Sequence, residues 1–136
     1  MPKLNNIVID TNVFVSAYVF KSKNLENQID FCMSNNILCF CQELVDEVLR
    51  IFTQRFNQNQ EVVEYFLDIV DKSKFYTLTE IYYFEADPKD GYLLSLSELA
   101  KADYLITGDK KHLLPLKTFH KTKIVSPTEF CEIISK

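Results

Sequence analysis

The stretch Ile7-Val8-Ile9-Asp10-Thr11-Asn12 decides the fold of this chain, because it joins a strand to the start of a helix. Ile7 to Ile9 is a short run of β-branched residues, which is typical of a parallel strand buried on both faces. The next three residues are all of types that favour the beginning of a helix. The stretch therefore predicts a strand that leads directly into a helix, with an acidic side chain at the junction.

Strand-like and helix-like segments alternate along the rest of the chain. The sequence predicts further strands at 37–40, 75–78, 81–84, 104–106 and 124–125. It predicts helices at 13–18, 24–34, 42–56, 60–72, 88–101 and from 127 onwards. Strands that alternate with helices favour a parallel sheet covered by helices on both faces, so the expected fold class is α/β.

Composition favours one folded domain over the whole chain. Of the 136 residues, 47% are hydrophobic, and only two are glycine and four are proline. This is enough apolar material for one core and leaves little for linkers. No internal repeat or boundary is visible, so a single domain at 1–136 is expected.

The charge and the cysteines narrow the class of protein further. The net charge of −4 argues against a sequence-independent DNA coat, but it leaves a nuclease open because a bound cation can reverse the local potential. The cysteines lack metal-binding spacing and suit a reduced core in the cytoplasm. We expect no signal peptide and no membrane span.

Acidic residues fall where the predicted parallel strands end. Asp10 follows the first strand and Asp109 follows the strand at 104–106. Asp90 lies in the first turn of the helix that precedes that strand, and Asp87-Pro88 gives this helix a capping residue and a first-turn proline. Because sites in α/β sheets form at the carboxyl ends of strands, these acids should share one edge. Asp103 lies at the opposite edge and is taken as structural.

The helix at 42–56 offers three acids in its first turns, which also lie at that edge. Leu44, Val48 and Phe52 mark its buried face. Glu47 lies just outside this buried arc, Glu43 lies further from it, and Asp46 faces nearly away. Glu47 is therefore the acid of this helix that we expect to reach the site.

Each acid also has a purely structural interpretation. Asp10 could cap a helix, Asp90 could complement a helix dipole, Asp109 could form a turn, and Glu47 could be a solvated helix residue. Four carboxylates in one cleft, however, would raise one another's pKa values unless a cation intervened. An oxygen-rich acidic site suits Mg²⁺ or Mn²⁺.

Four motifs in order resemble a known family. Val8 to Ala17 is similar to the opening of a PIN domain, and 43–48, 87–90 and 102–109 are similar to its later motifs. The resemblance covers essentially the whole chain. It implies a three-layer α/β/α sandwich with a central parallel sheet, and endoribonuclease activity that depends on Mg²⁺ or Mn²⁺. Its implied catalytic and metal-binding residues are Asp10, Glu47, Asp90 and Asp109.

Within this family the chain is most similar to the VapC-type toxins of toxin–antitoxin pairs. That likeness implies a homodimer and an antitoxin partner. Two departures concern toxin identity and metal affinity: Lys89 and Gly91 flank Asp90 where the family often has a denser acidic run, and Asn12 stands where VapC-type toxins more often have serine.

Other residues are candidates for contacts with RNA. Thr11 and Asn12 could bind the first carboxylate or a phosphate, or act only as helix caps. Lys110, Lys111 and His112 directly follow Asp109, and Lys21 and Lys23 follow the first helix. These residues could steer a phosphate backbone towards the metal or be solvated surface residues. The run at 82–84 either stacks on bases or packs as a core strand. His112 and His120 lack metal-ligand spacing and are expected to be surface or structural residues.

Two other functions are open at this point. A non-catalytic PIN-like module would bind RNA or a protein without a metal. A phosphatase or phosphoacceptor domain would also place an aspartate after the first strand, but the dehalogenase-like phosphatases need Asp-x-Asp where this chain has Asp10-Thr11-Asn12. The preferred hypothesis is an endoribonuclease, with the non-catalytic module as its alternative.

Overall fold

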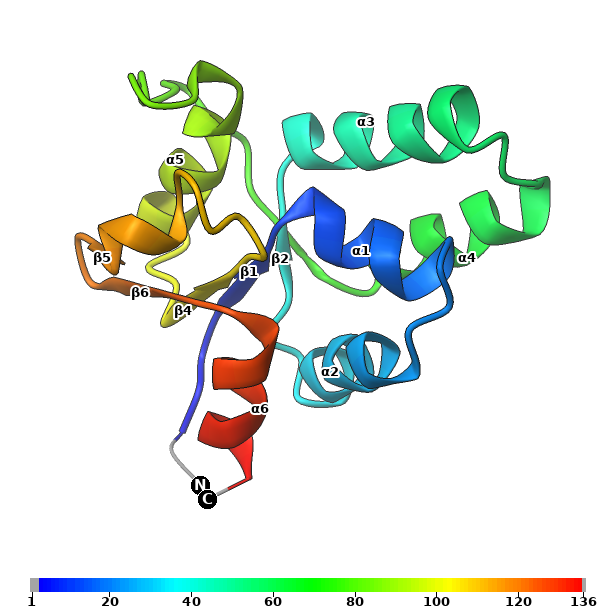
Figure 1. Cartoon of the computed structure of the whole chain (residues 1–136), viewed down its shortest axis with the longest axis horizontal. Helices are drawn as coiled ribbons and strands as arrows, with labels where there is room; N and C mark the ends of the chain where they lie inside the picture. The colour runs from blue at the N-terminus through cyan, green and yellow to red at the C-terminus, as the bar shows by residue number, and fades with distance from the viewer. Residues whose placement is uncertain (1–2, 136) are drawn as a thin grey trace.

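The computed structural model describes residues 3–135 (Figure 1). The strands are β1 (Ile7–Ile9), β2 (Cys39–Phe40), β3 (Lys74–Phe75), β4 (Tyr104–Ile106), β5 (Thr118–Phe119) and β6 (Thr122–Val125). The helices are α1 (Thr11–Tyr18), α2 (Lys23–Ser34), α3 (Gln42–Arg50), α4 (Gln60–Asp71), α5 (Gly91–Leu99) and α6 (Pro127–Ile134). A π-helical turn follows α3 at Ile51–Arg55, and 3₁₀ turns lie at Pro88–Asp90 and Leu114–Leu116.

The sheet is mostly parallel and has β1 and β4 at its centre. One set of paired strands has the order β1-β4-β6-β5, and β2 pairs with β3. A bridge between Ile7 and Leu38 joins the two sets. The β1–β4 and β4–β6 pairs are parallel, with Leu105 opposite both Val8 and Ile124. The carboxyl ends of β1, β4 and β6 therefore lie at one edge, as the expected α/β fold requires.

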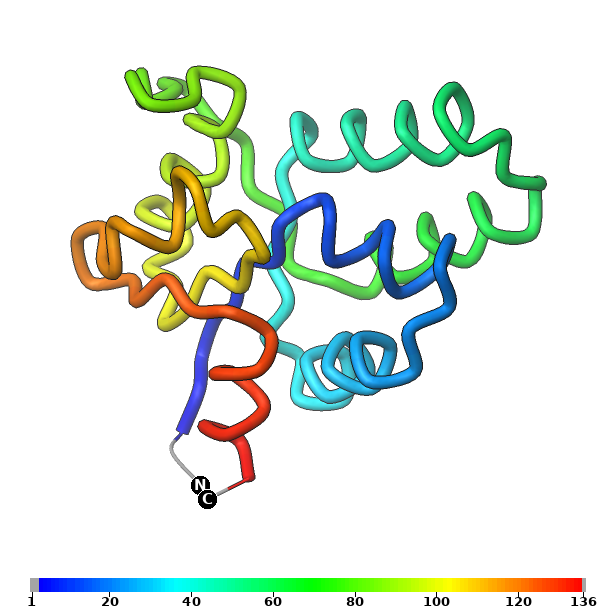
Figure 2. The backbone as a smooth tube through the Cα atoms, in the orientation of Figure 1, coloured from blue at the N-terminus to red at the C-terminus, as the bar shows by residue number. Residues whose placement is uncertain are grey.

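Helices lie to both sides of the central strands. Helices α1 to α4 lie to one side of β1, and α5 lies to the other with the β5–β6 hairpin, as the traces in Figures 1 and 2 show. All three residues of β1 are fully buried, which is why its sequence is apolar without alternation. On the α1 side, Phe14 and Phe66 pack with ring centroids 5.4 Å apart in an aromatic cluster that also contains Phe40 and Phe52.

The structure corrects three local expectations. The strand expected at 81–84 is wrong: within residues 3–135 this segment pairs with no strand, and three of its four side chains are exposed. The short strand β5 was not predicted, and it makes the sheet antiparallel at that edge. Its turn uses His120 at a φ of 54°, although turn residues of this kind are commonly glycine or asparagine. The helix expected over 42–56 is α-helical only to Arg50.

Among the described helices, none combines the length and the apolar character that a membrane crossing needs.

Candidate functional site

Asp10 directly follows β1, and its side-chain hydrogen bond is to the residue after β4 rather than to the helix that it precedes. It is only 4% exposed, and its side chain makes no capping hydrogen bond to α1. Its backbone N–H donates to the Ile106 carbonyl oxygen, and Thr107 Oγ1 donates a 2.7 Å hydrogen bond to Asp10 Oδ2. The geometry thus argues against Asp10 acting as a simple helix cap.

Burial raises the pKa of Asp10 to about 6, against an ordinary value of 3.8. The Thr107 hydrogen bond opposes this shift, and the nearby Glu47 and Asp109 carboxylates add to it. The charged form of Asp10 is therefore unfavourable in its surroundings unless a positive charge lies close by.

Asp109 lies in the turn after β4, with one carboxylate oxygen bound to the backbone. Asp109 Oδ1 accepts hydrogen bonds from the N–H groups of Lys111 and His112, each at 3.0 Å. The Asp109 N–H in turn donates to Thr107 Oγ1 at 3.0 Å. Asp109 therefore does stabilise its turn, but only through Oδ1, and its Oδ2 remains available for other contacts.

Asp90 is placed by the turn that precedes α5. Asp87 Oδ1 accepts from the Lys89 N–H at 3.2 Å and Pro88 opens the turn, as the sequence predicts. Burial raises the pKa of Asp90 to about 7, and repulsion from the carboxylates of Asp10 and Asp87 contributes to this shift. These shifts show that Asp90 lies within the electrostatic reach of the other acids.

Gly91, directly after Asp90, has a steric reason to be glycine. A Cβ at this position would collide with the carbonyl oxygen of Tyr82. The segment before the turn therefore packs its backbone against the first residue of α5. Glycine is a poor residue for the start of a helix. At position 91, however, it permits the close approach of the Tyr82 backbone that positions Asp90.

Glu47 on α3 faces the other acids, whereas its neighbours do not. Glu47 is partly buried and lines the same cleft as Asp10. Asp46 is exposed, and its Oδ1 accepts from Gln42 Nε2 at 2.8 Å. Glu43 does not line the cleft. The choice of Glu47 by helical angle agrees with this arrangement.

These side chains line one cleft of about 520 Å³ at the carboxyl edge of the sheet. All four acids selected from the sequence line it: Asp10, Glu47, Asp90 and Asp109. Asn12 lines it as well. Of the exposed neighbours Lys110 and Lys111, only Lys111 lines the cleft. Thr11 does not, because its side chain is buried and its Oγ1 lies 3.1 Å from the Tyr92 hydroxyl.

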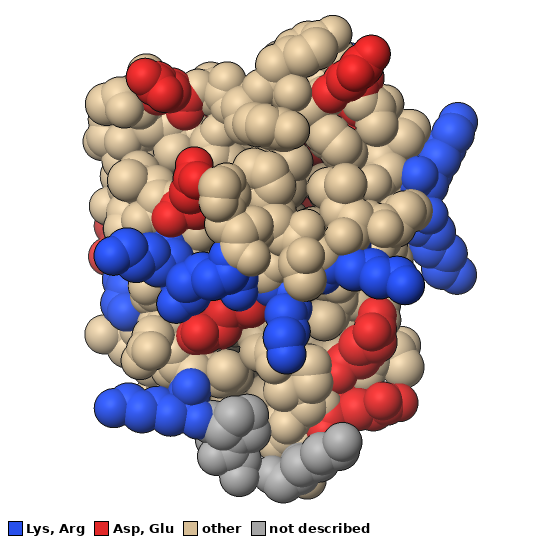
Figure 3. Space-filling view, turned by 90° about the vertical axis from the view of Figure 1, so that its left-hand side faces the viewer, with Lys and Arg blue, Asp and Glu red and all other residues tan. Residues whose placement is uncertain are grey.

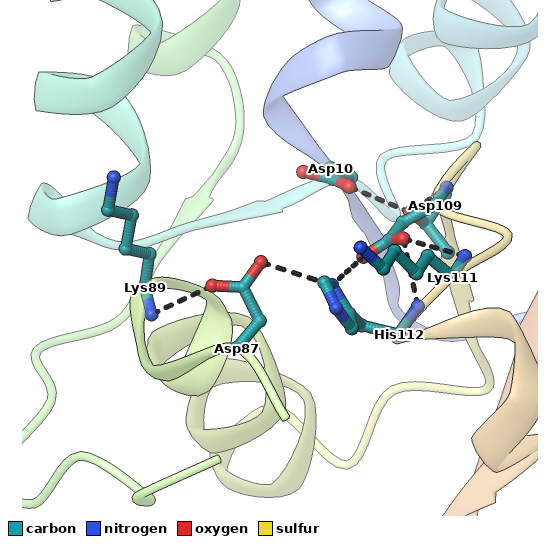
Figure 4. A network of polar contacts seen from close by, with 7 residues as sticks. Asp10, Asp87, Lys89, Asp109, Lys111 and His112 are labelled. Carbon is teal, nitrogen blue, oxygen red and sulfur yellow. Dashed lines mark hydrogen bonds and ion pairs between the residues drawn. The ribbon is translucent and has the colours of Figure 1, made fainter. Parts of the chain in front are cut away.

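Sequence reasoning missed two groups that line the cleft and one that supports it. Asp87, expected only as a helix cap, and His112, expected at the surface or in a structural role, both line it (Figure 4). Thr107 bridges two of the acids although it is fully buried. The only signal for Thr107 and His112 in the sequence was position: Thr107 lies two residues before Asp109, and His112 lies three residues after it, where the sequence suggests only a role in steering a phosphate backbone.

The donor atoms of the cleft fit a hard divalent cation. The carboxylates supply oxygen ligands, which Mg²⁺ and Mn²⁺ prefer. Burial raises the pKa values of Asp10 and Asp90, and repulsion between the carboxylates adds to the rise, so the ionised acids lack a compensating positive charge. A bound cation would provide that charge.

The chain belongs to the PIN domain family, because the family model for the PIN domain matches residues 6–111. Its fold is similar to that in the crystal structure of VapBC2 from Rickettsia felis bound to a promoter DNA fragment, with a TM-score of 0.64 and 13% identity over 88% of this chain and 97% of that one. It is also similar to PAE2754 from Pyrobaculum aerophilum, with a TM-score of 0.62 and 11% identity over 97% and 91% of the two chains. No curated protein matches its sequence.

Proposed function

We propose that this protein is a metal-dependent endoribonuclease that cleaves phosphodiester bonds of single-stranded RNA, with catalytic residues Asp10, Glu47, Asp90 and Asp109. The observation that carries the proposal is the convergence of these four carboxylates on one cleft from four separate segments of the chain. Single structural roles for each acid do not explain why all four line the same cavity. Membership of the PIN family supports the same class of activity.

The residues of the cleft would have different roles in the reaction. Asp10, Asp90 and Asp109 would hold Mg²⁺ or Mn²⁺, and Glu47 would complete the ligand set or orient the attacking water. The bound cation would lower the pKa of that water and stabilise negative charge on the scissile phosphate. Thr107 holds the Asp10 carboxylate and the Asp109 backbone in fixed positions. Asn12, which lines the cleft, could donate to a phosphate oxygen.

Charge on the surface supports RNA as the substrate despite the net charge of −4. Figure 3 shows lysine and arginine side chains in a band across the face that α5 and the β5–β6 hairpin present. Exposed lysines on or beside this hairpin are Lys117, Lys121 and Lys123. Lys111 brings positive charge to the cleft itself, and Lys110 lies exposed beside it. Such lysines attract a phosphate backbone towards the acids.

The biological role within this proposal is the toxin of a toxin–antitoxin pair in the cytoplasm. The similar fold in the Rickettsia felis VapBC2 structure supports it. An antitoxin would bind this chain and block the cleft, and the protein would form a homodimer. Co-purification with the product of a neighbouring gene, and the mass of the purified protein in solution, test these parts separately from the chemistry.

The alternative is a non-catalytic PIN-like module that binds RNA or a protein. The observation that favours it is the imidazole of His112, whose Nδ1 lies 3.4 Å from Asp87 Oδ2 and 3.7 Å from Asp109 Oδ2, so that a side chain of the protein itself faces two of the acids. This alternative predicts neither metal binding nor cleavage. Calorimetric titration with Mn²⁺ separates the two functions.

The direct test is incubation of the protein with labelled single-stranded RNA and Mg²⁺ or Mn²⁺, with and without chelator. We expect metal-dependent cleavage that falls by about 10- to 100-fold or more in Asp10→Asn. Asp46→Asn is the control for Glu47→Gln, because both acids are on α3 and only Glu47 lines the cleft. Cleavage that survives unchanged in Asp10→Asn or in chelator would overturn the proposal.

A further inference from the structure

The imidazole of His112 faces two carboxylates at the side of the cleft. Its Nδ1 lies 3.4 Å from Asp87 Oδ2 and 3.7 Å from Asp109 Oδ2. Figure 4 shows the ring between the two acids. One ligand atom from each of the three residues lies within 4.8 Å of the others, and each side chain is less than a third exposed. The three residues come from two loops that are far apart in the sequence.

The backbone orients both carboxylates so that one oxygen of each is bound and the other faces the imidazole. Asp87 Oδ1 accepts from the Lys89 N–H, and Asp109 Oδ1 accepts from two backbone N–H groups of its own turn. The Oδ2 atoms are the ones that approach His112 Nδ1. Ligands held in this way need little reorganisation to bind an ion.

The spacing of these atoms suits a shared ion better than direct hydrogen bonds. Nitrogen–oxygen hydrogen bonds in proteins usually span about 2.7 to 3.2 Å, and both gaps to His112 Nδ1 are longer. Ligands that share one ion at bond lengths of about 2.1 Å lie about 3 to 4 Å from one another. Both gaps fall in that range.

We propose that His112 Nδ1 and Asp87 Oδ2 are metal ligands of the cleft alongside Asp109, and that this nitrogen makes the cleft favour transition-metal ions such as Mn²⁺ or Zn²⁺ over Mg²⁺. The inference rests on the proposed metal-dependent function and adds one nitrogen and one carboxylate to its donor set. Imidazole is a softer ligand than carboxylate and suits transition metals, whereas Mg²⁺ prefers oxygen alone.

The competing interpretation is that His112 is a protonated counter-charge for Asp87 and Asp109. In that case its nitrogen carries a proton and cannot coordinate an ion, so a bound cation would displace or repel it. The two interpretations differ in whether nitrogen is bonded to the metal, which can be measured without any activity assay.

The test loads the purified protein with Mn²⁺ and measures nitrogen coupling to the bound ion by electron spin echo envelope modulation. We expect nitrogen modulation in the wild-type protein and its loss in His112→Ala. His120→Ala is the matched control, because His120 is exposed and pairs with Glu98 at 2.7 Å. Bound Mn²⁺ without nitrogen modulation, or modulation that persists in His112→Ala, overturns this inference and leaves the proposed function standing. A wild-type protein that binds no Mn²⁺ overturns both this inference and the proposed function.

Affinity gives a second, independent readout. We expect His112→Ala and Asp87→Asn each to weaken Mn²⁺ binding at least about tenfold in calorimetric titrations. Only His112→Ala should weaken Mg²⁺ binding less than Mn²⁺ binding, because Asp87 offers an oxygen ligand that suits both ions. Asp87→Asn keeps an oxygen that can accept from the Lys89 N–H, so the turn should fold as before. Equal losses for the two metals in His112→Ala would contradict the metal preference, and no loss of Mn²⁺ affinity in either variant would contradict the assignment of these ligands. Thermal unfolding in chelator verifies that each variant is folded.

Discussion

Thr107 Oγ1 donates a 2.7 Å hydrogen bond to Asp10 Oδ2, across 97 residues of sequence. The same hydroxyl oxygen accepts from the Asp109 N–H at 3.0 Å. One fully buried side chain, directly after β4, therefore links two of the four acids. The relationship makes Thr107 a positioning residue for the proposed metal site.

Thr107→Val should loosen the site without changing the volume of the side chain. The valine leaves the Asp109 N–H without its partner, so we expect a loss of about 1–3 kcal/mol in the free energy of unfolding. We also expect Mn²⁺ affinity to fall about 10- to 100-fold. Urea unfolding and calorimetric titration measure the two effects. Thr107→Ser keeps the hydroxyl and should restore both, and a valine variant that behaves like the wild type would refute the role.

The metal-free protein should lose stability as pH rises from about 4 to 7. The pKa of Asp10 is about 6 in the folded protein and 3.8 ordinarily, so the folded state binds more protons within this window. Stability then decreases with pH, by about 2–3 kcal/mol from Asp10 alone, and the raised pKa of Asp90 acts in the same direction.

Thermal unfolding in chelator across this pH range tests whether the stability of the metal-free protein falls as pH rises. Asp10→Asn cannot titrate, so its unfolding temperature should fall less than that of the wild type. With Mn²⁺ present, the wild type should gain more stability at a pH of about 7.5 than at about 5, because ligand carboxylates must be deprotonated to bind. An identical pH profile for the wild type and Asp10→Asn would contradict the assignment.

Gly91→Ala should destabilise the protein although alanine is the better helix former. The added Cβ would collide with the Tyr82 carbonyl oxygen, and displacement of that backbone should decrease the free energy of unfolding by about 1–3 kcal/mol. Gly108→Ala is the matched control, because a Cβ built there has no described atom within 4 Å apart from those of its chain neighbours. Equal stability of the two variants in urea would show that the close approach is unimportant.

The lysines of the hairpin should contribute to RNA affinity through charge alone. Replacing Lys117, Lys121 and Lys123 with glutamine should weaken binding of single-stranded RNA. The slope of log affinity against log salt should become shallower by about 0.7 for each phosphate that the protein no longer neutralises. Fluorescence anisotropy at several salt concentrations measures both quantities.

Lys72→Gln is the control for these substitutions, because Lys72 pairs with Asp68 on α4, away from the hairpin. Cleavage of a small diester substrate should be unchanged in the triple variant, since such a substrate cannot reach the band. If the triple variant binds RNA with the wild-type salt slope, the band is not part of the RNA-binding surface.

Local patterns in the sequence determined the parallel core and which acids gather at its edge. The apolar run at 7–9 is recognisable as a buried strand without knowledge of its partner strands. The alternation of strands and helices predicts that Asp10 and Asp109 lie at the same edge of the sheet. The period of a helix was enough to separate Glu47 from Asp46. These are short-range or topological properties, and the sequence contains them directly.

Local patterns failed where contacts between distant segments override propensity. The segment at 81–84 has the composition of a strand, yet it pairs with no strand among the described residues. Its contact with β5 is between side chains, where the ring of Tyr82 packs on that of Phe119. Its backbone instead packs on α5, where the Tyr82 N–H donates to Ser95 Oγ. The β5–β6 hairpin lacks the usual turn residues, so its turn could not be predicted from the sequence.

The sequence by itself determined the α/β core and the four acids that line the cleft. Only the tertiary structure decided which groups surround them: Thr107 between Asp10 and Asp109, and Asp87 opposite His112. The reason is physical, because a buried hydroxyl or imidazole has no local pattern of its own. Its role depends on which atoms the fold brings within a few ångströms, and that is settled by the packing of segments far apart in the chain.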